Sequence, residues 1–263
     1  MKFNRIFISL ALAAISFTAC DEVDEANRFK ELEKIEIKRT VLLEDFTGQD
    51  CTNCPDGHRV IARLQEQEQY GENIIAVGIH AGEFGIAEGS NPNILGLMQP
   101  EGNEYAKKAG VQTYPAGIVD RCSSPLTYTG WAEAVRKEMS KESKLNIEVS
   151  AKLNGDKIDI STQLKPNADA KGKLQLWITE NGITAYQKDN GKYLMDYVHN
   201  HVYRASVNGT WGEEISLSAN VFPALTHSIA LKENWNKANL TVVAFVYNDA
   251  EGVLQAAECK VTE

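Results

Sequence analysis

The hydrophobic pattern of this chain changes its period near residue 145, and this change limits the folds that the chain can adopt. Before that point, apolar strands alternate with segments whose apolar residues recur at helical spacing, an order typical of an α/β layer fold. After it, about seven short segments alternate apolar and polar residues with period two, as in an antiparallel β-sandwich. The expected α/β elements are strands at 40–46, 73–81 and 111–120 and helices at 58–71, 101–110 and 129–142.

The N-terminal residues predict export from the cytoplasm. A cationic start, MKFNR, precedes the apolar run IFISLALAAISF, which has the length of a signal-peptide core and is too short to span a bilayer. The following Phe17-Thr18-Ala19-Cys20 resembles a bacterial lipobox, in which Cys20 would carry lipid as the first mature residue. Acyl chains on Cys20 would anchor the protein to a membrane surface. The alternative is an ordinary secreted protein that is cleaved nearby, with Cys20 as a spare thiol.

The charge of the chain excludes one class of partner. A formal net charge of −9 repels phosphate backbones, so nucleic acid is not expected to bind. Acidic residues are concentrated directly after Cys20, in DEVDEANRFKELEKIE. This segment is expected to be a solvated tether between the membrane and the folded domain. It also resembles the surface-export signals of Bacteroidota lipoproteins.

Two cysteines, Cys51 and Cys54 in QDCTNCPDG, lie where the first strand passes into the first helix. Cys51 is expected at or near the helix N-terminus, where unpaired N–H groups favour a thiolate and lower the pKa of a cysteine. Cys54, one turn further on, is placed to resolve a mixed disulfide. The pair alone is compatible with a redox couple, a structural disulfide or a zinc site. No second ligand pair follows at zinc-finger spacing.

The order strand, CxxC, helix resembles the thioredoxin fold, and residues outside the pair extend the resemblance. Asp45 precedes Cys51 at the offset of the buried acid that assists proton transfer in thioredoxins. Pro115 matches the cis-proline that faces the disulfide, and Tyr114 matches the residue whose backbone pairs with a bound peptide. The resemblance implies a catalytic set of Cys51, Cys54, Asp45, Tyr114 and Pro115.

The chain also departs from thioredoxins near the cysteines. Asp50 replaces the aromatic residue that usually precedes the first cysteine, and its carboxylate disfavours a thiolate at Cys51. The intervening Thr52-Asn53 matches neither the Gly-Pro of reductants nor the His-bearing pair of oxidants. Residues 80–100 are a long insertion that could cover or shape the site.

Two longer stretches, VLLEDFTGQDCTNCPDGH and YVHNHVYRASVNGTWGEE, together with the lipobox, are similar to the 28-kDa outer-membrane protein family of Bacteroidota. The resemblance implies a lipoprotein on the periplasmic or cell-surface face of the outer membrane. It also implies a thioredoxin-like domain followed by an Ig-like β-sandwich. No cofactor or metal is expected. The expected boundaries are a signal peptide at 1–19, a tether at 20–36 and domains at 37–143 and 144–263.

Four further residues have chemistry that the sequence alone does not assign. His199 and His201 are expected on one face of a strand, as a polar cross-strand pair or, less readily, as metal ligands that lack a third partner nearby in sequence. Cys122 and Cys259 could form a disulfide if their Cα atoms lie within about 7 Å.

Two functions fit these patterns. In the first, the protein is a membrane-anchored thiol–disulfide oxidoreductase whose clients are exported proteins. In the second, it is a non-enzymatic surface lipoprotein whose scaffold and β-sandwich bind a ligand or a protein partner. A fold alone does not decide between them.

Overall fold

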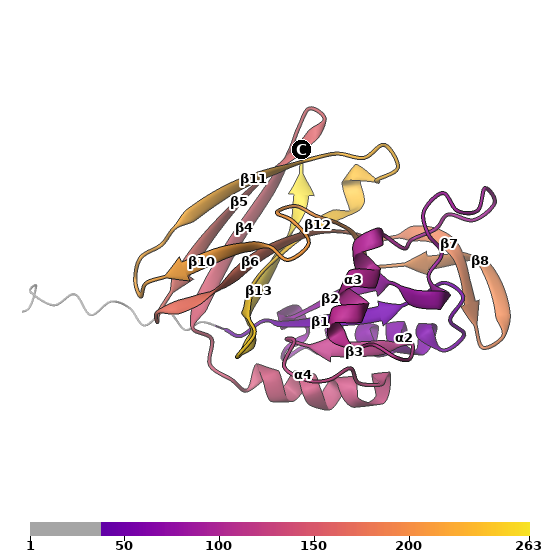
Figure 1. Ribbon diagram of the computed structural model, residues 1–263, viewed down its shortest axis with the longest axis horizontal. Helices are drawn as coiled ribbons and strands as arrows, with labels where there is room; N and C mark the ends of the chain where they lie inside the picture. Colours follow the sequence, from indigo (N-terminus) through magenta and orange to yellow (C-terminus); the bar gives the residue numbers. More distant parts are fainter. Residues whose placement is uncertain (1–37) are drawn as a thin grey trace, which may run out of the picture. The chain divides into compact units, whose positions relative to one another are not determined.

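The computed structural model describes residues 38–263, so Cys20, the predicted signal peptide and the whole predicted tether lie outside the described residues. The first half of the described chain has the predicted order of strands and helices (Figure 1). No helix within residues 38–263 is long and apolar enough to cross a membrane. The elements are β1 (Val41–Thr47), α2 (Cys54–Gln65), β2 (Ile74–His80), α3 (Pro100–Ala109), β3 (Ala116–Val119) and α4 (Trp131–Met139).

The second half consists of strands, and it has more of them than the period-two pattern predicted. The period-two segment at 197–207 is divided between β8 and β9, and β7 and β10 are additional strands. The full set is β4 (Leu145–Asn154), β5 (Lys157–Pro166), β6 (Ala170–Glu180), β7 (Ile183–Asp189), β8 (Lys192–His199), β9 (Val202–Ser206), β10 (Glu213–Leu217), β11 (Ala224–Ala230), β12 (Leu240–Asn248) and β13 (Gly252–Thr262).

Strands from both halves form one mixed sheet of 11 strands, in the order β11-β5-β4-β13-β12-β6-β9-β2-β1-β3, with β10 on β6. The halves join where β2 pairs in parallel with β9, at Gly78 and Val202. The pairing of β13 with β4 is also parallel, at Val261 and Ala151. The predicted fold class, an α/β thioredoxin-like domain followed by an antiparallel β-sandwich, is therefore wrong.

The physical reason is that the hydrophobic pattern identifies strands but not their partners. The edge of β2 is covered by β9, and the two halves share a buried core on that side of the sheet. Trp177 of β6 lies fully buried in this core. The shared core also contains Leu42, Phe46, Ile75, Val77, Tyr105, Tyr203, Val243 and Phe245. The predicted boundary after residue 143 stays a prediction.

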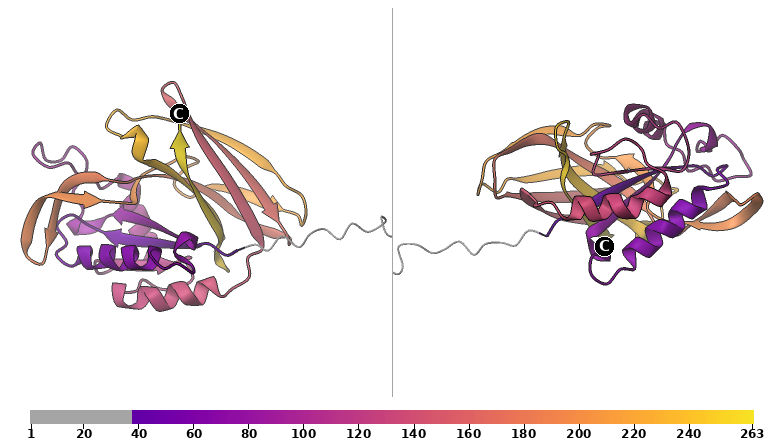
Figure 2. Two further views of the ribbon diagram at one scale, coloured as in Figure 1. Left: turned by 180° about the vertical axis from the view of Figure 1, so that it is seen from behind. Right: turned by 90° about the horizontal axis from the view of Figure 1, so that it is seen from below.

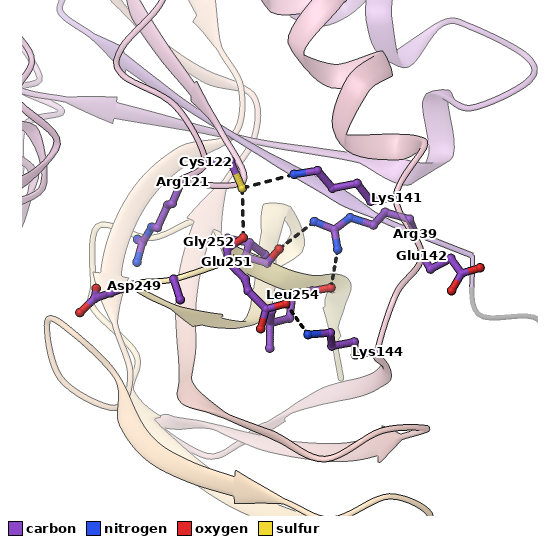
Figure 3. Close-up of a pocket in the computed structure, with 12 residues that line it drawn as sticks. Arg39, Arg121, Cys122, Lys141, Glu142, Lys144, Asp249, Glu251, Gly252 and Leu254 are labelled. Carbon is purple, nitrogen blue, oxygen red and sulfur yellow. Dashed lines mark hydrogen bonds and ion pairs between the residues drawn. The ribbon is translucent and has the colours of Figure 1, made fainter.

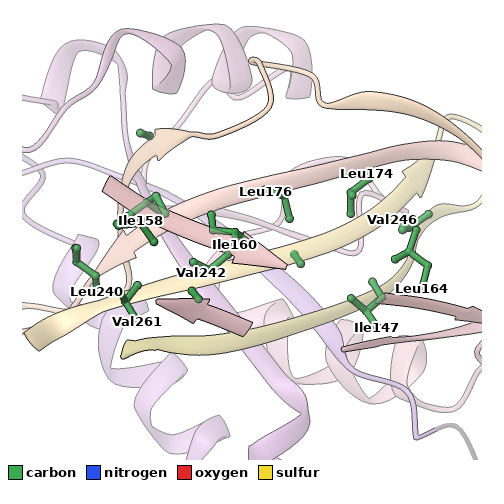
Figure 4. Close-up of a cluster of buried hydrophobic side chains, with 14 of the residues drawn as sticks. Ile147, Ile158, Ile160, Leu164, Leu174, Leu176, Leu240, Val242, Val246 and Val261 are labelled. Carbon is green, nitrogen blue, oxygen red and sulfur yellow. The ribbon is translucent and has the colours of Figure 1, made fainter. Parts of the chain in front are cut away.

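A second core belongs to the C-terminal strands alone. Figure 4 shows apolar side chains from neighbouring strands gathered on one face of the sheet. They follow from the period-two pattern, because alternate residues of a strand point to the same face. Members include Ile147, Ile158, Ile160, Leu164, Leu174, Leu176, Val242 and Val246.

The helices cover both faces of the strands that lead to the cysteines. Alternation along β1 directs Val41 and Leu43 toward α2 and α4, and Leu42 and Phe46 toward α3. Figure 2 shows α2 and α4 on the same side of these strands. Because every residue of β1 is buried, the chain enters the cysteine loop from a fixed position.

The hairpin β7–β8 is the main element that the sequence analysis missed. Its turn is Asn190-Gly191, both residues with positive φ, as a type I′ hairpin turn requires. Strand β8 ends at His199, and His201 follows in a turn with φ of 56°. The prediction that His199 and His201 share one strand face is therefore wrong.

Candidate functional site

The cysteine pair forms a disulfide at the start of α2, with its Cα atoms 5.4 Å apart. Cys54 is the first helical residue and Asn53 is the N-cap, so Cys51 lies before the helix rather than at its cap. Both residues are buried, with Cys51 3% exposed and Cys54 0% exposed. Direct attack on either sulfur therefore requires movement of the segments that cover them.

The hairpin β7–β8 is one of these covering segments. The side-chain amide of Gln187 donates hydrogen bonds to the carbonyl oxygens of Gly48 and Cys51, at 3.2 and 3.1 Å. The backbone N–H groups of Lys188 and Asn190 donate to the carbonyls of Gln49 and Thr52. The hairpin thus holds the cysteine loop through hydrogen bonds to the backbone of that loop. The Asn190-Gly191 turn was the sequence signal that could have revealed the hairpin.

Asp50, the residue before Cys51, is bound by the same hairpin. The hydroxyl of Tyr186 donates to Oδ1 of Asp50 at 2.9 Å. Desolvation and this carboxylate raise the pKa of Tyr186 to about 12. A groove of about 740 Å³ begins here, lined by Asp50, Tyr186, Tyr193, Met195 and residues of the 85–98 segment. Tyr193 and Met195 are 69% and 61% exposed, so the groove presents apolar surface beside the cysteine loop.

The Tyr114–Pro115 peptide bond is cis, and the loop that contains it packs beside α2. Pro115 lies near Gly57 of α2, where a Cβ would be at an ordinary contact distance of 3.5 Å from it; the same Cβ would lie only 2.8 Å from the ring of Trp131, so Gly57 makes room for that ring. The ring of Tyr114 packs edge-on against Phe84, with centroids 5.8 Å apart. The 80–100 insertion therefore contacts both this loop and the cysteine loop, where the carbonyl of Phe84 accepts the N–H of Asp50.

Asp45 is the most perturbed acid in the described part of the chain. Its side chain is fully buried on β1, and neither carboxyl oxygen has a hydrogen-bond partner among the described residues. Desolvation raises the pKa of Asp45 to about 8. The imidazole of His58 approaches it, with the Nε2 atom 3.6 Å from Oδ2 of Asp45. A buried, unpaired acid with a raised pKa is typical of catalytic sites.

The predicted catalytic residues thus come from adjoining parts of one region. Asp45 lies on β1, Cys51 lies in the loop that follows, Cys54 begins α2, and Pro115 lies near the first turn of α2. Sequence reasoning missed the contribution of His80 and Tyr197, and it assigned His58 no firm role. These side chains line a cavity of about 480 Å³ that also reaches Asp45. Among the described residues, no group of three metal-ligating side chains could hold a metal ion.

The remaining cysteines are not part of this site. Cys122 and Cys259 are both free, so the disulfide considered from the sequence is not formed. The Cys122 sulfur contacts the carbonyl of Glu251 and the ammonium of Lys141 in a charged cavity (Figure 3). Partial burial and nearby Glu138 raise the pKa of Cys122 to about 11. The thiol is therefore neutral at physiological pH and a poor nucleophile.

Comparison with known proteins identifies the family of the chain. A family model described as outer membrane protein Omp28 matches residues 102–263. The chain belongs to the Omp28 outer membrane protein family. This confirms the resemblance found in the sequence and its implied location at the outer membrane. The matched region begins after Cys54, so membership of this Omp28 family does not itself assign a role to the cysteine pair.

Solved structures similar to this Omp28-family chain include HBP35 of Porphyromonas gingivalis, at 16% identity and a TM-score of 0.69. That similarity covers 86% of this chain and 76% of HBP35, and it concerns the fold alone. A domain of the outer membrane lipoprotein Omp28 from Porphyromonas gingivalis is 24% identical, with a TM-score of 0.35, over 46% of this chain and 89% of that domain. No curated protein has a significantly similar sequence.

Proposed function

We propose that this chain is a lipid-anchored thiol–disulfide oxidoreductase of the outer membrane, attached through Cys20 and acting on exported proteins. The observation that carries the proposal is the state of Asp45, which is fully buried, unpaired and raised in pKa on the strand that leads into the cysteine loop. Burying such a group costs free energy, so its presence on the strand that leads into a CxxC loop favours a role in proton transfer over a purely structural one.

The roles of the residues follow from their positions. The Cys51 thiolate attacks one sulfur of a client disulfide, forming a mixed disulfide and releasing the other client sulfur as a thiolate. Cys54 then attacks Cys51, which closes the Cys51–Cys54 bond and releases the second client thiolate. Asp45 accepts the proton that Cys54 loses. The backbone at Tyr114, beside Pro115, pairs with the client.

The groove beside Asp50 supports access by a protein client. It exposes the side chains of Tyr193 and Met195 next to the cysteine loop, where an unfolded segment could be held by apolar contacts. Because Cys51 is 3% exposed in the oxidised protein, the hairpin β7–β8 must move when a client reacts. The same hairpin bears Tyr193 and Met195, so client contact and hairpin movement would be coupled.

The proposal is tested by trapping clients in cells. A Cys54→Ser variant cannot resolve a mixed disulfide, so it should accumulate as covalent complexes that a reductant dissolves. The matched control is Cys51→Ser, which lacks the attacking thiol and should give no complexes. Equal recovery of complexes from both variants, or none from either, would oppose the assignment. Separately, Cys20→Ala should move the protein from the detergent phase to the soluble fraction.

One observation favours a second candidate function. Both sulfurs are buried, and the cysteine loop is held by hydrogen bonds from Gln187, Lys188 and Asn190. A permanently closed disulfide would then only stabilise the loop, and the protein would be a non-enzymatic surface lipoprotein that binds a ligand or protein partner. In that case neither cysteine variant traps a client, while each lowers the stability of the fold.

A further inference from the structure

Four of the five histidines of the chain converge on one cavity, which is lined by α2, the ends of β1 and β2, and the end of β8. They come from separate elements: His58 from α2, His80 from the end of β2, and His199 and His201 from the end of β8 and the turn after it. The rings of His80 and His199 lie 5.5 Å apart, and those of His58 and His199 lie 6.3 Å apart. This convergence depends on the β7–β8 hairpin, since β8 brings half of the histidines to the site.

The two ring nitrogens of His58 contact different groups in this cavity. Its Nε2 atom lies 3.1 Å from Oγ1 of Thr47 and 3.6 Å from Oδ2 of Asp45. Its Nδ1 atom lies 2.8 Å from the hydroxyl of Tyr197. Asp45 is fully buried, whereas the His58 side chain is 22% exposed and Tyr197 is half-buried. The imidazole therefore separates a buried carboxyl group from a hydroxyl that lies nearer to solvent.

The protonation states of these groups suit a relay. Desolvation and the neighbouring His199 lower the pKa of His58 to about 3, so the ring is neutral at physiological pH. A neutral imidazole has one donor and one acceptor nitrogen, and it can accept a proton on one while releasing a proton from the other. Desolvation raises the pKa of Tyr197 to about 12, so its hydroxyl also keeps a proton.

The other groups around His58 do not provide a competing path. Both ring nitrogens of His80 and the Nδ1 atom of His199 are buried and have no hydrogen-bond partner among the described residues. Desolvation lowers the pKa of both rings, so they are neutral as well. The charged or titratable groups that face the cavity or act on its imidazoles are Asp45, Arg59, Glu66, Asp189, Tyr197, His201 and Arg204.

We propose that His58 and Tyr197 form the path by which the proton on Asp45 reaches solvent when the Cys51–Cys54 disulfide closes, an inference that rests on the proposed function. As the bond closes, Cys54 gives its proton to the Asp45 carboxylate, and the client leaves as a thiolate reduced by two electrons. The Asp45 and His58 side chains then close their 3.6 Å separation to hydrogen-bonding distance, and Asp45 protonates Nε2 of His58 while Nδ1 releases its proton to the Tyr197 oxygen. Tyr197 gives its own proton to water. The proton that remains on the His58 ring then moves from Nε2 back to Nδ1, which restores the starting protonation state of every group. One proton therefore leaves for each disulfide formed.

Asp45 needs such a path because its side chain is fully buried, so a proton taken from Cys54 has no direct route to solvent. A protonated Asp45 cannot accept the proton of Cys54 in the next cycle. His58 acts on the disulfide only through Asp45. It is therefore a positioning residue, which holds the Asp45 proton on its route to solvent. Thr47, also within hydrogen-bonding distance of His58, fixes the ring toward Asp45.

The first test follows the proton itself and needs no client. In the full chain, NMR titration of the Asp45 carboxyl carbon and the His58 ring nitrogens should reveal a common step near pH 8. The step at His58 should disappear in Asp45→Asn. A His58 signal that is unchanged through the Asp45 titration overturns the relay. This result is separate from the proposed function, whose failure is seen as a lack of trapped clients.

The second test measures closure of the reduced cysteine pair by oxidised glutathione. Formation of the mixed disulfide on Cys51 should keep its wild-type rate in His58→Phe and Tyr197→Phe. Closure by Cys54 should slow about tenfold or more near neutral pH, the scale of lost acid–base assistance. The defect should shrink above pH 8, where Asp45 loses its proton directly to hydroxide. The control His227→Gln changes a histidine that pairs with Glu213 on another strand. Wild-type closure rates and pH profile in both cavity variants would overturn the relay.

Discussion

The Nε2 atom of His58 lies 3.6 Å from Oδ2 of Asp45, a carboxyl group that has no hydrogen-bond partner among the described residues. This contact connects the helix that begins at Cys54 with the strand that leads to Cys51. It also connects a raised acid pKa with a lowered histidine pKa, because both groups are removed from water. Protonation of this region should therefore be visible in the stability of the whole protein.

Replacing Asp45 with Asn should change how stability depends on pH. The folded-state pKa of Asp45 is about 8, against 3.8 when unfolded, so the folded protein holds this proton more tightly. The stabilisation of the folded state by this tighter proton binding is fully present below pH 3.8 and is lost as pH rises to about 8. Over that window Asp45→Asn should gain stability relative to the wild type, by up to about 5 kcal/mol. Denaturant unfolding at pH 5, 7 and 9 measures this difference. A difference that does not vary with pH would contradict the raised pKa.

His199 should have the opposite effect, because its burial should lower the free energy of unfolding as the pH falls. The pKa of His199 falls from 6.5 to about 4 on folding, because burial disfavours the charged ring. Its contribution is present above pH 6.5 and is lost as pH falls toward 4. His199→Gln should remove about 2–3 kcal/mol of this acid destabilisation while keeping a donor toward the carbonyl of Tyr186. The wild-type protein supplies the reference slope between pH 6.5 and 4. Unfolding curves in which His199→Gln and the wild type have the same slope would refute the prediction.

The limits of sequence reasoning are clearest at this cavity. The CxxC pair, Asp45 and Tyr114-Pro115 are readable because they lie at fixed offsets from local elements. His80 and Tyr197 are not, since they meet only after β2 pairs with β9 and the β7–β8 hairpin folds over the cysteine loop. Sequence patterns encode which residues are strands and which faces are apolar. They do not encode which distant strand covers the free edge of β2, and this missing information made the two-domain fold prediction wrong.

Loosening the hairpin should expose the disulfide. Gln187 is fully buried and donates to the carbonyls of Gly48 and Cys51, so Gln187→Ala leaves both acceptors without this partner. The cost should be about 1–3 kcal/mol, concentrated in the contact between the hairpin and the loop. Reduction of the Cys51–Cys54 bond by a small phosphine should accelerate about tenfold or more, as the closed form loses free energy.

The control for this variant is Gln67→Ala, whose amide donates to a backbone carbonyl on the exposed end of α2. It should leave the reduction rate at the wild-type value. Thiol labelling after a timed pulse of reductant provides the measurement. If Gln187→Ala and Gln67→Ala react equally fast, the hairpin does not limit access to the disulfide.

The central claim is that Cys51 and Cys54 exchange disulfides, and their reduction potential tests it most directly. Structural disulfides in secreted proteins lie below about −300 mV, whereas labile and catalytic ones lie above that value. Equilibration of the full chain with defined ratios of reduced and oxidised dithiothreitol or glutathione gives the potential. We expect a value above about −300 mV. A value clearly below it would contradict disulfide exchange and would assign the pair to stabilising the cysteine loop.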